Sequence, residues 1–222
     1  MINFAVIGTN FITDRFLEAA SSVPEFHLKA VYSRSMEKAE GYARRHGAER
    51  TFDSLDELAA CADVDAVYVA SPNCCHAPQS IQMMRAGKHV LVEKPVASNL
   101  DEFCRMKETA MENSVILLEA MRSVFSPGFS VLRENLHELG VIRRVSFQFC
   151  QYSRRYDKFK NGIIENAFKP EMSNNMVYET EEFIRLIHAG AVEHRWLKNT
   201  ETEMKIMDEV RAQQGIRFPA DR

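Results

Sequence analysis

The sequence predicts an α/β protein: a doubly wound parallel sheet of the Rossmann type, followed by a second, truncated α+β domain. Three observations lead to this prediction. Short apolar strands alternate with amphipathic helices from residue 3 to residue 118. These strands are apolar throughout, which indicates a parallel sheet covered by helices on both faces. After Pro127 the alternation gives way to a strand with only one apolar face.

Hydrophobic periodicity predicts the elements of the first part in chain order. An apolar run at 3–8 predicts the first strand, and the spacing of Phe16, Leu17, Ala20 and Val23 predicts the helix that follows it. The remaining predicted strands are at 28–32, 66–70, 89–92 and 115–118, and the remaining predicted helices at 36–46, 55–61, 78–86 and 100–112. Such a sheet binds ligands at the carboxyl ends of its strands.

The second part contains one clear strand. A helix is predicted at 128–139, a strand at 141–152, and two more helices at 177–188 and 202–214. A single strand cannot form a sheet, so something must supply its neighbours. We therefore expect the protein to be at least a dimer through the strand at 141–152, because an apolar strand face without partners is an association site.

The composition is that of an ordinary globular protein. Of 222 residues, 45% are hydrophobic and 27% are charged, and the net charge of -3 gives no indication of a nucleic-acid partner. No apolar run approaches the ~20 residues needed to cross a bilayer, and the start lacks the basic segment of a signal peptide. We expect a cytoplasmic protein with no membrane contact. The five cysteines include the adjacent Cys74 and Cys75 but no spaced pair, so reduced thiols and no metal site are expected.

Residues at the ends of the first two strands indicate a dinucleotide. Gly8 ends the first strand, but Asn10 and Thr13 stand where the G-x-G-x-x-G fingerprint has glycines. The helix start can still offer N–H groups to a pyrophosphate, and the alternative is a bare structural turn. The second strand ends in Ser33-Arg34, where a protein specific for NAD carries an acid. This pair suits the 2'-phosphate of NADP, unless Ser33 caps the next helix and Arg34 is solvated.

Polar residues also follow the next two predicted strands. Ser71, Asn73 and His76 come after one of them, and Glu93 and Lys94 come after the other. Alone, His76 is most simply a helix-cap residue and the Glu93–Lys94 pair an exposed ion pair. Together with the first turn, they place polar groups along one edge of the sheet, where this kind of fold binds its ligand.

Five motifs occur in chain order. They are G-x-N-x-I at 8–12, S-R at 33–34, S-P-N-x-x-H at 71–76, H-V-L-V-E-K-P at 89–95 and E-A-M-R at 119–122. Together they resemble the glucose-fructose oxidoreductase and inositol dehydrogenase family (Gfo/Idh/MocA), over about the first 170 residues and again in the helical tail. The resemblance implies a Rossmann domain joined to a larger domain with an open sheet. It also implies hydride transfer between NAD(P) and a hydroxyl carbon of a sugar, cyclitol or similar diol.

The resemblance implies roles for individual residues. The residues implied to hold the pyrophosphate are Gly8, Thr9, Asn10, Phe11 and Ile12, and those implied at the adenosine end are Ser33 and Arg34. The other implied cofactor-binding residues are Ser71, Asn73, His76, Glu93, Lys94, Met121 and Arg122. Lys94 is the implied catalytic residue, since its ammonium can stabilise negative charge that develops on the substrate oxygen. A cis bond between Lys94 and Pro95 is implied as well.

One part of the family's pattern is missing. The substrate domain of the family contains a stretch resembling G-G-x-x-x-D-x-G-x-Y-x-x-H, which helps bind the substrate and handle its proton. This chain passes from Ser173 directly to Asn174 and the closing helices. We therefore expect a dinucleotide-binding domain at 1–122 and a partial substrate and oligomerisation domain at 123–222, with an apparent deletion near 173–174. A truncated gene product and an omitted segment are both compatible with the sequence.

The sequence assigns no acid or base to work with Lys94. His188 lies at a predicted helix end, where a cation has a structural role, and His194 lies in a charged run that most simply forms a solvated connector. Tyr152 and Tyr156 are better candidates for binding the substrate together with Lys94, although tyrosines in such segments are more often packing residues.

Three functions are weighed. The first is an oxidoreductase that uses NADP, with NAD as the alternative, and acts on a polyol or sugar. The second is a catalytically silent NAD(P)-binding sensor or scaffold, which the missing stretch favours and the retained E-K-P run opposes. The third is a methyltransferase, which is weaker because Ser33-Arg34 replaces the acid that such enzymes carry at the end of the second strand.

Overall fold

The computed structural model describes residues 1–144 and 174–221. Helices α2 and α5 have the bounds predicted from the sequence. The elements, with η for a 3-10 helix, are β1 (Ile2–Ile7), α1 (Phe11–Ala20), β2 (Phe26–Tyr32), α2 (Met36–His46), β3 (Arg50–Phe52), α3 (Leu55–Ala60), β4 (Ala66–Val69), η1 (Asn73–Cys75), α4 (His76–Arg85), β5 (His89–Glu93), α5 (Leu100–Glu112), β6 (Leu117–Ala120), α6 (Pro127–Asn135), η2 (Leu136–Leu139), α7 (Met176–Ala189), α8 (Arg195–Gln213) and η4 (Pro219–Asp221).

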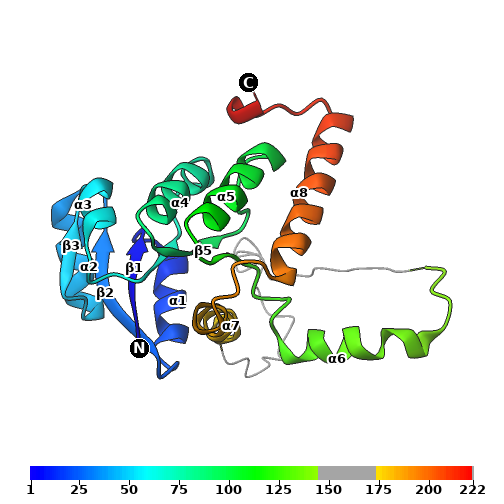
Figure 1. The fold of residues 1–222 in the computed structure, drawn as a ribbon, viewed down its shortest axis with the longest axis horizontal. Coiled ribbons are helices and arrows are strands. Elements are labelled where there is room, and N and C mark those ends of the chain that lie inside the picture. Colours follow the sequence, from blue (N-terminus) through cyan, green and yellow to red (C-terminus); the bar gives the residue numbers. More distant parts are fainter. Residues whose placement is uncertain (145–173, 222) are drawn as a thin grey trace, which may run out of the picture.

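The strands form one parallel sheet in the order β3-β2-β1-β4-β5-β6 (Figure 1). This order confirms the predicted doubly wound Rossmann fold. The chain moves outward from β1 to β3 and then returns to the other side of β1 at β4. The crevice beyond the carboxyl ends of β1 and β4 is therefore the switch point at which such sheets bind their ligands.

Two hydrophobic cores lie on the two faces of the sheet. On one face α1, α2 and α7 pack through aromatic rings, with Phe16 stacked on Tyr68 at 3.7 Å between centroids and Phe4 against Phe183 at 5.9 Å. On the other face α3, α4, α5 and α8 contribute buried side chains, among them Met204 of α8. Helix α7 thus shares the first core and α8 mainly the second, on opposite faces of the sheet (Figure 1), while Trp196 of α8 also belongs to the first core.

Most boundaries shift by one or two residues from the prediction, and three differences have an identifiable cause. Strand β3 was not predicted, because it has three residues and none of them is fully buried. Strand β6 begins at Leu117, two residues later than expected, since the His89 ring accepts the Ile116 N–H at 2.9 Å. Helix α8 begins at Arg195, seven residues before the predicted start at 202, because its buried stripe already includes Trp196.

Helix α6 stands apart from the sheet (Figure 1). Ser126 caps its first turn by accepting the Phe129 N–H at 3.3 Å, but no residue of α6 or η2 is buried. Of the strand predicted at 141–152, only residues 141–144 are described, and they carry no strand. Within the described residues, no helix has the length and apolar character that a membrane span requires.

Candidate functional site

The turn after β1 admits only glycine at its first position. Gly8 has a φ of +112°, and a Cβ placed there would lie 2.5 Å from the carbonyl oxygen of Ala70 at the end of β4. The two strand ends approach one another this closely at the switch point of the sheet. A side chain at position 8 would push them apart and close the space in which a phosphate could approach the backbone.

Asn10 has a more specific role than the fingerprint suggested. Its backbone is extended, with a φ of −103°, so this position does not require the conformational freedom of a glycine. Its Oδ1 accepts the N–H groups of Ile12 and Thr13, and its Nδ2 donates to the Ala70 carbonyl oxygen at 2.7 Å. The side chain therefore caps α1 and ties the turn to β4. Among the described residues, the N–H groups of Thr9, Asn10 and Phe11 have no acceptor and are the donors available to an anion.

A cleft of about 530 Å³ runs along this edge of the sheet. It lies at the carboxyl ends of β1, β2 and β4, where the sequence predicted a ligand. Its lining residues are Ile7, Gly8, Thr9, Asn10, Tyr32, Ser33, Arg34, Ser35, Lys38, Ala70, Ser71, Pro72, Cys75 and Gln79. Two of the residues implied to hold a pyrophosphate are not among the lining residues. Phe11 is exposed, and Ile12 packs against the core.

The β2 side of the cleft carries two cations. Arg34 and Lys38 line the cleft, and neither forms an ion pair within the described residues. The alternative in which Ser33 caps the next helix is wrong, because Ser35 is the N-cap of α2 and its Oγ accepts the Lys38 N–H at 3.4 Å. Lys38 was not predicted as a site residue. Its spacing of four residues from Arg34, across the first turn of a helix, is the signal that could have identified it.

The β4 side of the cleft is held by hydrogen bonds between side chains and backbone. Ser71 donates from Oγ to Oε1 of Gln79 at 2.6 Å. The His76 ring is buried, with Nδ1 2.8 Å from the Pro95 carbonyl oxygen and Nε2 2.9 Å from the Ser71 carbonyl oxygen. His76 therefore links the loops after β4 and β5, and neither it nor Asn73 is among the residues that line the cleft.

At the end of β5, Glu93 and Lys94 have different surroundings. Glu93 is buried, and its Oε1 accepts the Tyr68 hydroxyl at 2.6 Å while its Oε2 accepts the Lys94 N–H at 3.2 Å. Burial and the Glu93 charge raise the pKa of Tyr68 well above its ordinary value, so the phenol remains a donor to the carboxylate. Lys94 is exposed, it forms no ion pair within the described residues, and its bond to Pro95 is cis, as the resemblance implied.

Glu119, at the end of β6, joins three parts of the fold. Its Oε1 accepts the Val96 N–H at 3.0 Å, and its Oε2 accepts the Thr200 hydroxyl of α8 at 2.9 Å. Burial, with a smaller effect from the Glu203 charge, raises the pKa of Glu119 to about 7. The E-A-M-R motif thus contains a structural carboxyl group, followed by the half-buried Met121 and the exposed Arg122.

Glu179 of α7 was not predicted as a site residue. It lies close enough to Glu93 and Arg122 for their charges to shift its pKa. It is fully buried, and neither carboxyl oxygen has a hydrogen-bond partner within the described residues. Burial and the negative charge of Glu93 raise its pKa well above the ordinary value, and Arg122 opposes this shift. Both effects favour the uncharged form of the carboxyl group. The helical pattern could have shown that position 179 faces inward, since Met176, Thr180 and Phe183 of the same helix are buried.

The remaining candidates lie elsewhere. His188 contacts Glu25 at 2.6 Å near the end of α7, which agrees with a structural role. The prediction that His194 is a solvated connector is wrong: its Nε2 lies 3.0 Å from the Leu117 carbonyl oxygen, and burial lowers its pKa. Tyr152 and Tyr156 lie outside the described residues. Within the described residues no three His, Cys, Asp or Glu side chains are placed to hold a metal ion.

Comparisons with known proteins agree on one family. Residues 2–121 match the model of an oxidoreductase family with an NAD-binding Rossmann fold, GFO_IDH_MocA. Over 179 residues the chain is 50% identical to scyllo-inositol 2-dehydrogenase (NADP(+)) IolU of Bacillus subtilis and 43% identical to the uncharacterized oxidoreductase YgjR of Escherichia coli. These alignments cover 81% of this chain and 55% of each relative. The chain therefore spans about half the length of the curated relatives it matches, which agrees with the stretch found missing from the sequence.

A solved structure gives the same result. The 3-ketoreductase KijD10 of Actinomadura kijaniata, in complex with TDP-benzene and NADP, aligns with a TM-score of 0.58 and 34% identity. The alignment covers 64% of this chain and 44% of KijD10. The shared part is large enough to include the sheet and the cleft at its edge, since the sheet lies within residues 2–120.

Proposed function

The chain belongs to the Gfo/Idh/MocA oxidoreductase family, which has an NAD-binding Rossmann fold, and we propose that it binds NADP, with NAD as the alternative, along the cleft at the carboxyl edge of its sheet. The observation that carries the proposal is the pair of cations, Arg34 and Lys38, that line the cleft without an ion-pair partner in the described residues. The hydroxyls of Ser33 and Ser35 lie beside them. A 2'-phosphate dianion matches this set of donors.

The chemistry of the β2 end supports NADP over NAD. A carboxylate at this position would bind the ribose hydroxyls of NAD and repel a 2'-phosphate. Residues 33–36 contain no acid, and the cleft offers Arg34 and Lys38 instead. The names and ligands of the relatives reported above, IolU and KijD10, point to the same cofactor.

We further propose that the protein transfers a hydride between the cofactor and a hydroxyl carbon of a sugar, cyclitol or similar diol. The nicotinamide supplies or accepts the hydride. Lys94 is the residue proposed to act on the substrate oxygen, because its exposed ammonium lies at the end of a central strand with no ion-pair partner in the described residues. Glu93 is less suited to act on the substrate oxygen, since both its carboxyl oxygens already accept hydrogen bonds within the protein.

A silent NAD(P)-binding sensor or scaffold is the second candidate. Two observations favour it: the alignment covers 55% of the length of IolU, and the chain lacks the D-x-G-x-Y-x-x-H stretch. Both candidates require the cleft to bind a dinucleotide. Only the oxidoreductase requires Lys94.

Fluorescence titration with NADPH and NADH tests the cofactor. We expect tighter binding of NADPH, and loss of a charge-assisted hydrogen bond in Arg34→Ala or Lys38→Ala should weaken it by about 10- to 100-fold. NADH binding should change much less. Arg44→Ala is the matched control, because Arg44 lies on the same helix and pairs with Glu40. Equal affinities in the wild type would count against the proposed 2'-phosphate site.

Turnover with a panel of polyols and sugars separates the two candidates. Lys94→Ala should retain NADPH binding but lose about a hundredfold or more in the rate of NADP reduction. Arg85→Ala, which removes an exposed cation from α4, is the control. If the wild-type chain binds NADPH but reduces no NADP with any substrate of the panel, the sensor or scaffold is the remaining function.

We also propose a cytoplasmic location and a homo-oligomer. Four cysteines of the described residues are free thiols, and this state is usual in a reducing compartment. The exposed apolar residues around α6 support association.

A further inference from the structure

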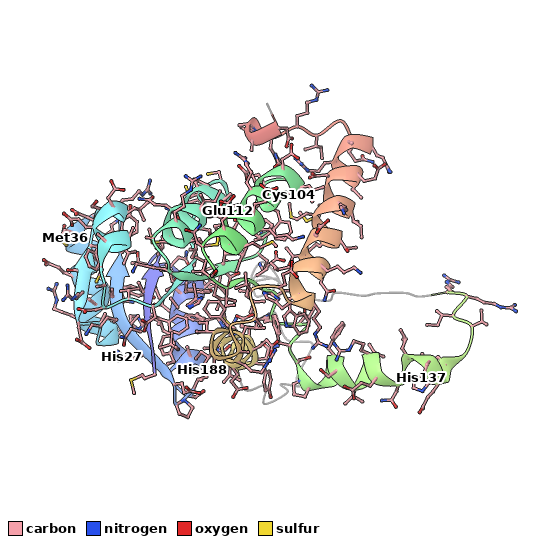
Figure 2. All side chains as sticks on the ribbon, in the orientation of Figure 1. His27, Met36, Cys104, Glu112, His137 and His188 are labelled. Carbon is pink, nitrogen blue, oxygen red and sulfur yellow. The ribbon has the colours of Figure 1, made fainter. Side chains whose placement is uncertain are left out.

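Two adjacent thiols lie at the rim of the cleft. Cys74 and Cys75 belong to η1, directly after β4, and their sulfur atoms are 3.9 Å apart. Cys74 is exposed, and Cys75 lines the cleft. The other described cysteines lack such a neighbour: Cys61 is buried, and Cys104 lies on α5 (Figure 2).

The separation of the two sulfur atoms fits a bridging atom better than a direct bond. A disulfide requires about 2.05 Å between the sulfurs. Two thiolates on one tetrahedral centre with bonds of about 2.3 Å lie about 3.8 Å apart. A trivalent arsenic atom binds three substituents in a pyramid with narrower angles, so its two sulfurs lie somewhat closer together than this. The observed 3.9 Å is an S–H···S contact, so an arsenic atom that binds both sulfurs requires them to approach one another only by a fraction of an ångström.

The surroundings select a ligand that needs only two protein groups and carries no charge. No cluster of three metal-binding side chains exists within the described residues, so a zinc-like ion would lack protein ligands. The cations Arg34 and Lys38 line the same cleft and disfavour a dication. Burial and the Cys74 thiol raise the pKa of Cys75, although the Arg34 charge opposes the shift. A protonated thiol is a poor nucleophile in disulfide exchange.

We propose that Cys74 and Cys75 form a dithiol site for trivalent arsenic, as arsenous acid or an organoarsenical. Both ligands are uncharged at neutral pH. With phenylarsine oxide, two S–H bonds and the As=O bond break and two As–S bonds form. The two thiol protons leave with the oxygen as one water molecule, and no oxidant or reductant is needed. No net charge is created or lost beside Arg34.

Occupancy of this site would obstruct the dinucleotide cleft, because the Cys75 side chain is part of its wall. This consequence rests on the proposed function, whereas the dithiol site itself does not.

Intact-mass measurement of the full chain with phenylarsine oxide tests the site. In excess 2-mercaptoethanol, we expect one phenylarsenic group per chain, with the loss of two hydrogens, and its removal by 2,3-dimercaptopropanol. An adjacent second thiol acts at an effective concentration in the millimolar range or above. Cys74→Ser and Cys75→Ser should therefore each lose the adduct by about tenfold or more.

Two controls keep the test decisive. Cys104→Ser and Cys150→Ser should retain the adduct; Cys104 lacks a vicinal thiol, and Cys150 lies outside the described residues. Since Cys74 is exposed, Cys74→Ser decides the result even if Cys75→Ser does not fold. An absent adduct on the wild type, or an adduct that survives 2-mercaptoethanol in Cys74→Ser, would overturn the site.

Competition with NADPH tests the consequence separately. In a protein shown to bind NADPH, saturating NADPH should slow labelling, and the arsenical adduct should lower NADPH affinity. Equal labelling rates with and without NADPH would overturn the obstruction but leave the mass result standing. Labelling without any NADPH binding would instead overturn the proposed function.

Discussion

The strands of the Rossmann sheet and helix α6 both carry many apolar residues, but only the strands bury them. All four residues of β4 are buried, and α7 adds the fully buried Phe183 to the same core. In α6 and the residues after it, Val131 is 60% exposed and Val141 is 86% exposed. Figure 2 shows His137 of this segment standing away from the body of the protein, whereas His188 of α7 lies against it.

The difference shows what an apolar pattern does and does not specify. It predicts an element and the face that the element will bury, because burial removes apolar surface from water. It does not name the surface that covers this face. For the sheet, α1 to α5, α7 and α8 supply that surface within the described residues. For α6 they do not.

Truncation of a core ring tests this difference most strongly. Phe183→Ala removes a buried ring that packs against Phe4, and it should lower the free energy of unfolding by about 3–5 kcal/mol. Leu132→Ala on the exposed face of α6 should change it by less than about 0.5 kcal/mol. Urea denaturation measures both. A small loss for Phe183→Ala would show that α7 is not an integral part of the sheet's core.

Glycine replacement compares the backbones of the two regions. Gly8→Ala places a methyl group 2.5 Å from the Ala70 carbonyl oxygen at a φ of +112°, which should cost about 3 kcal/mol and abolish dinucleotide binding. Gly128→Ala, in α6, meets no atom within 4 Å. It should be neutral or stabilise by up to about 1 kcal/mol. Thermal unfolding of the two variants, with NADPH titration of each, provides the measurement.

The pH dependence of stability tests the packing of Glu119. Its folded pKa is about 7 against an ordinary value of 4.5, so the folded state binds more protons between these values. Its contribution to stability is fully present below about pH 4.5 and is lost as the pH rises through 7, by up to about 3 kcal/mol. Glu119→Gln keeps an oxygen for the Val96 N–H and an amide for the Thr200 hydroxyl, and it cannot ionise.

Glu119→Gln should therefore gain stability relative to the wild type as the pH is raised from 5 to 8. Urea denaturation at several pH values measures the gain. Glu112→Gln, at an exposed position of α5, controls for the removal of one carboxylate. Parallel pH curves for Glu119→Gln and the wild type would contradict the raised pKa.

The sequence predicted the sheet better than the site. The apolar strands and the helices α2 and α5 follow from periodicity, since each strand is buried on both faces and each helix on one. The cleft was predicted from Gly8 and Arg34, because the chemistry of each of these residues can be recognised in the sequence without knowing its neighbours in the fold. Lys38 and Glu179 were missed although local helical spacing places Lys38 near Arg34 and Glu179 on a buried helix face. The rest of the cleft wall around Lys38 and the Glu93 charge near Glu179 come from other segments. His76 looked like a cleft residue, yet its ring links two backbone carbonyl groups.

The same reasoning explains the missed start of α8. The charged residues Glu193 to Arg195 suggested a solvated connector, because charge usually marks a surface. In the structure His194 reaches the Leu117 carbonyl oxygen, and the buried stripe of α8 begins at Trp196. The surface that covers these residues is β6, more than seventy residues earlier in the chain, and local periodicity does not reveal it.

The smallest effect on stability is expected from polar replacement on α6, where association is the informative readout. Exposed apolar residues without a cover in the described chain are expected to pair with a second copy, and light scattering should show the wild type as at least a dimer at micromolar concentration. Leu132→Asp combined with Val141→Asp should change the free energy of unfolding of the subunit by less than about 0.5 kcal/mol but shift the molar mass to that of the monomer. Ile206→Asp, which replaces an exposed apolar residue of α8, should leave the molar mass unchanged. If the wild type is a monodisperse monomer, or if Ile206→Asp dissociates it as fully as the α6 variant does, the apolar face of α6 does not pair with a second copy. The sheet and α6 would then differ only in how their apolar residues pack within one chain.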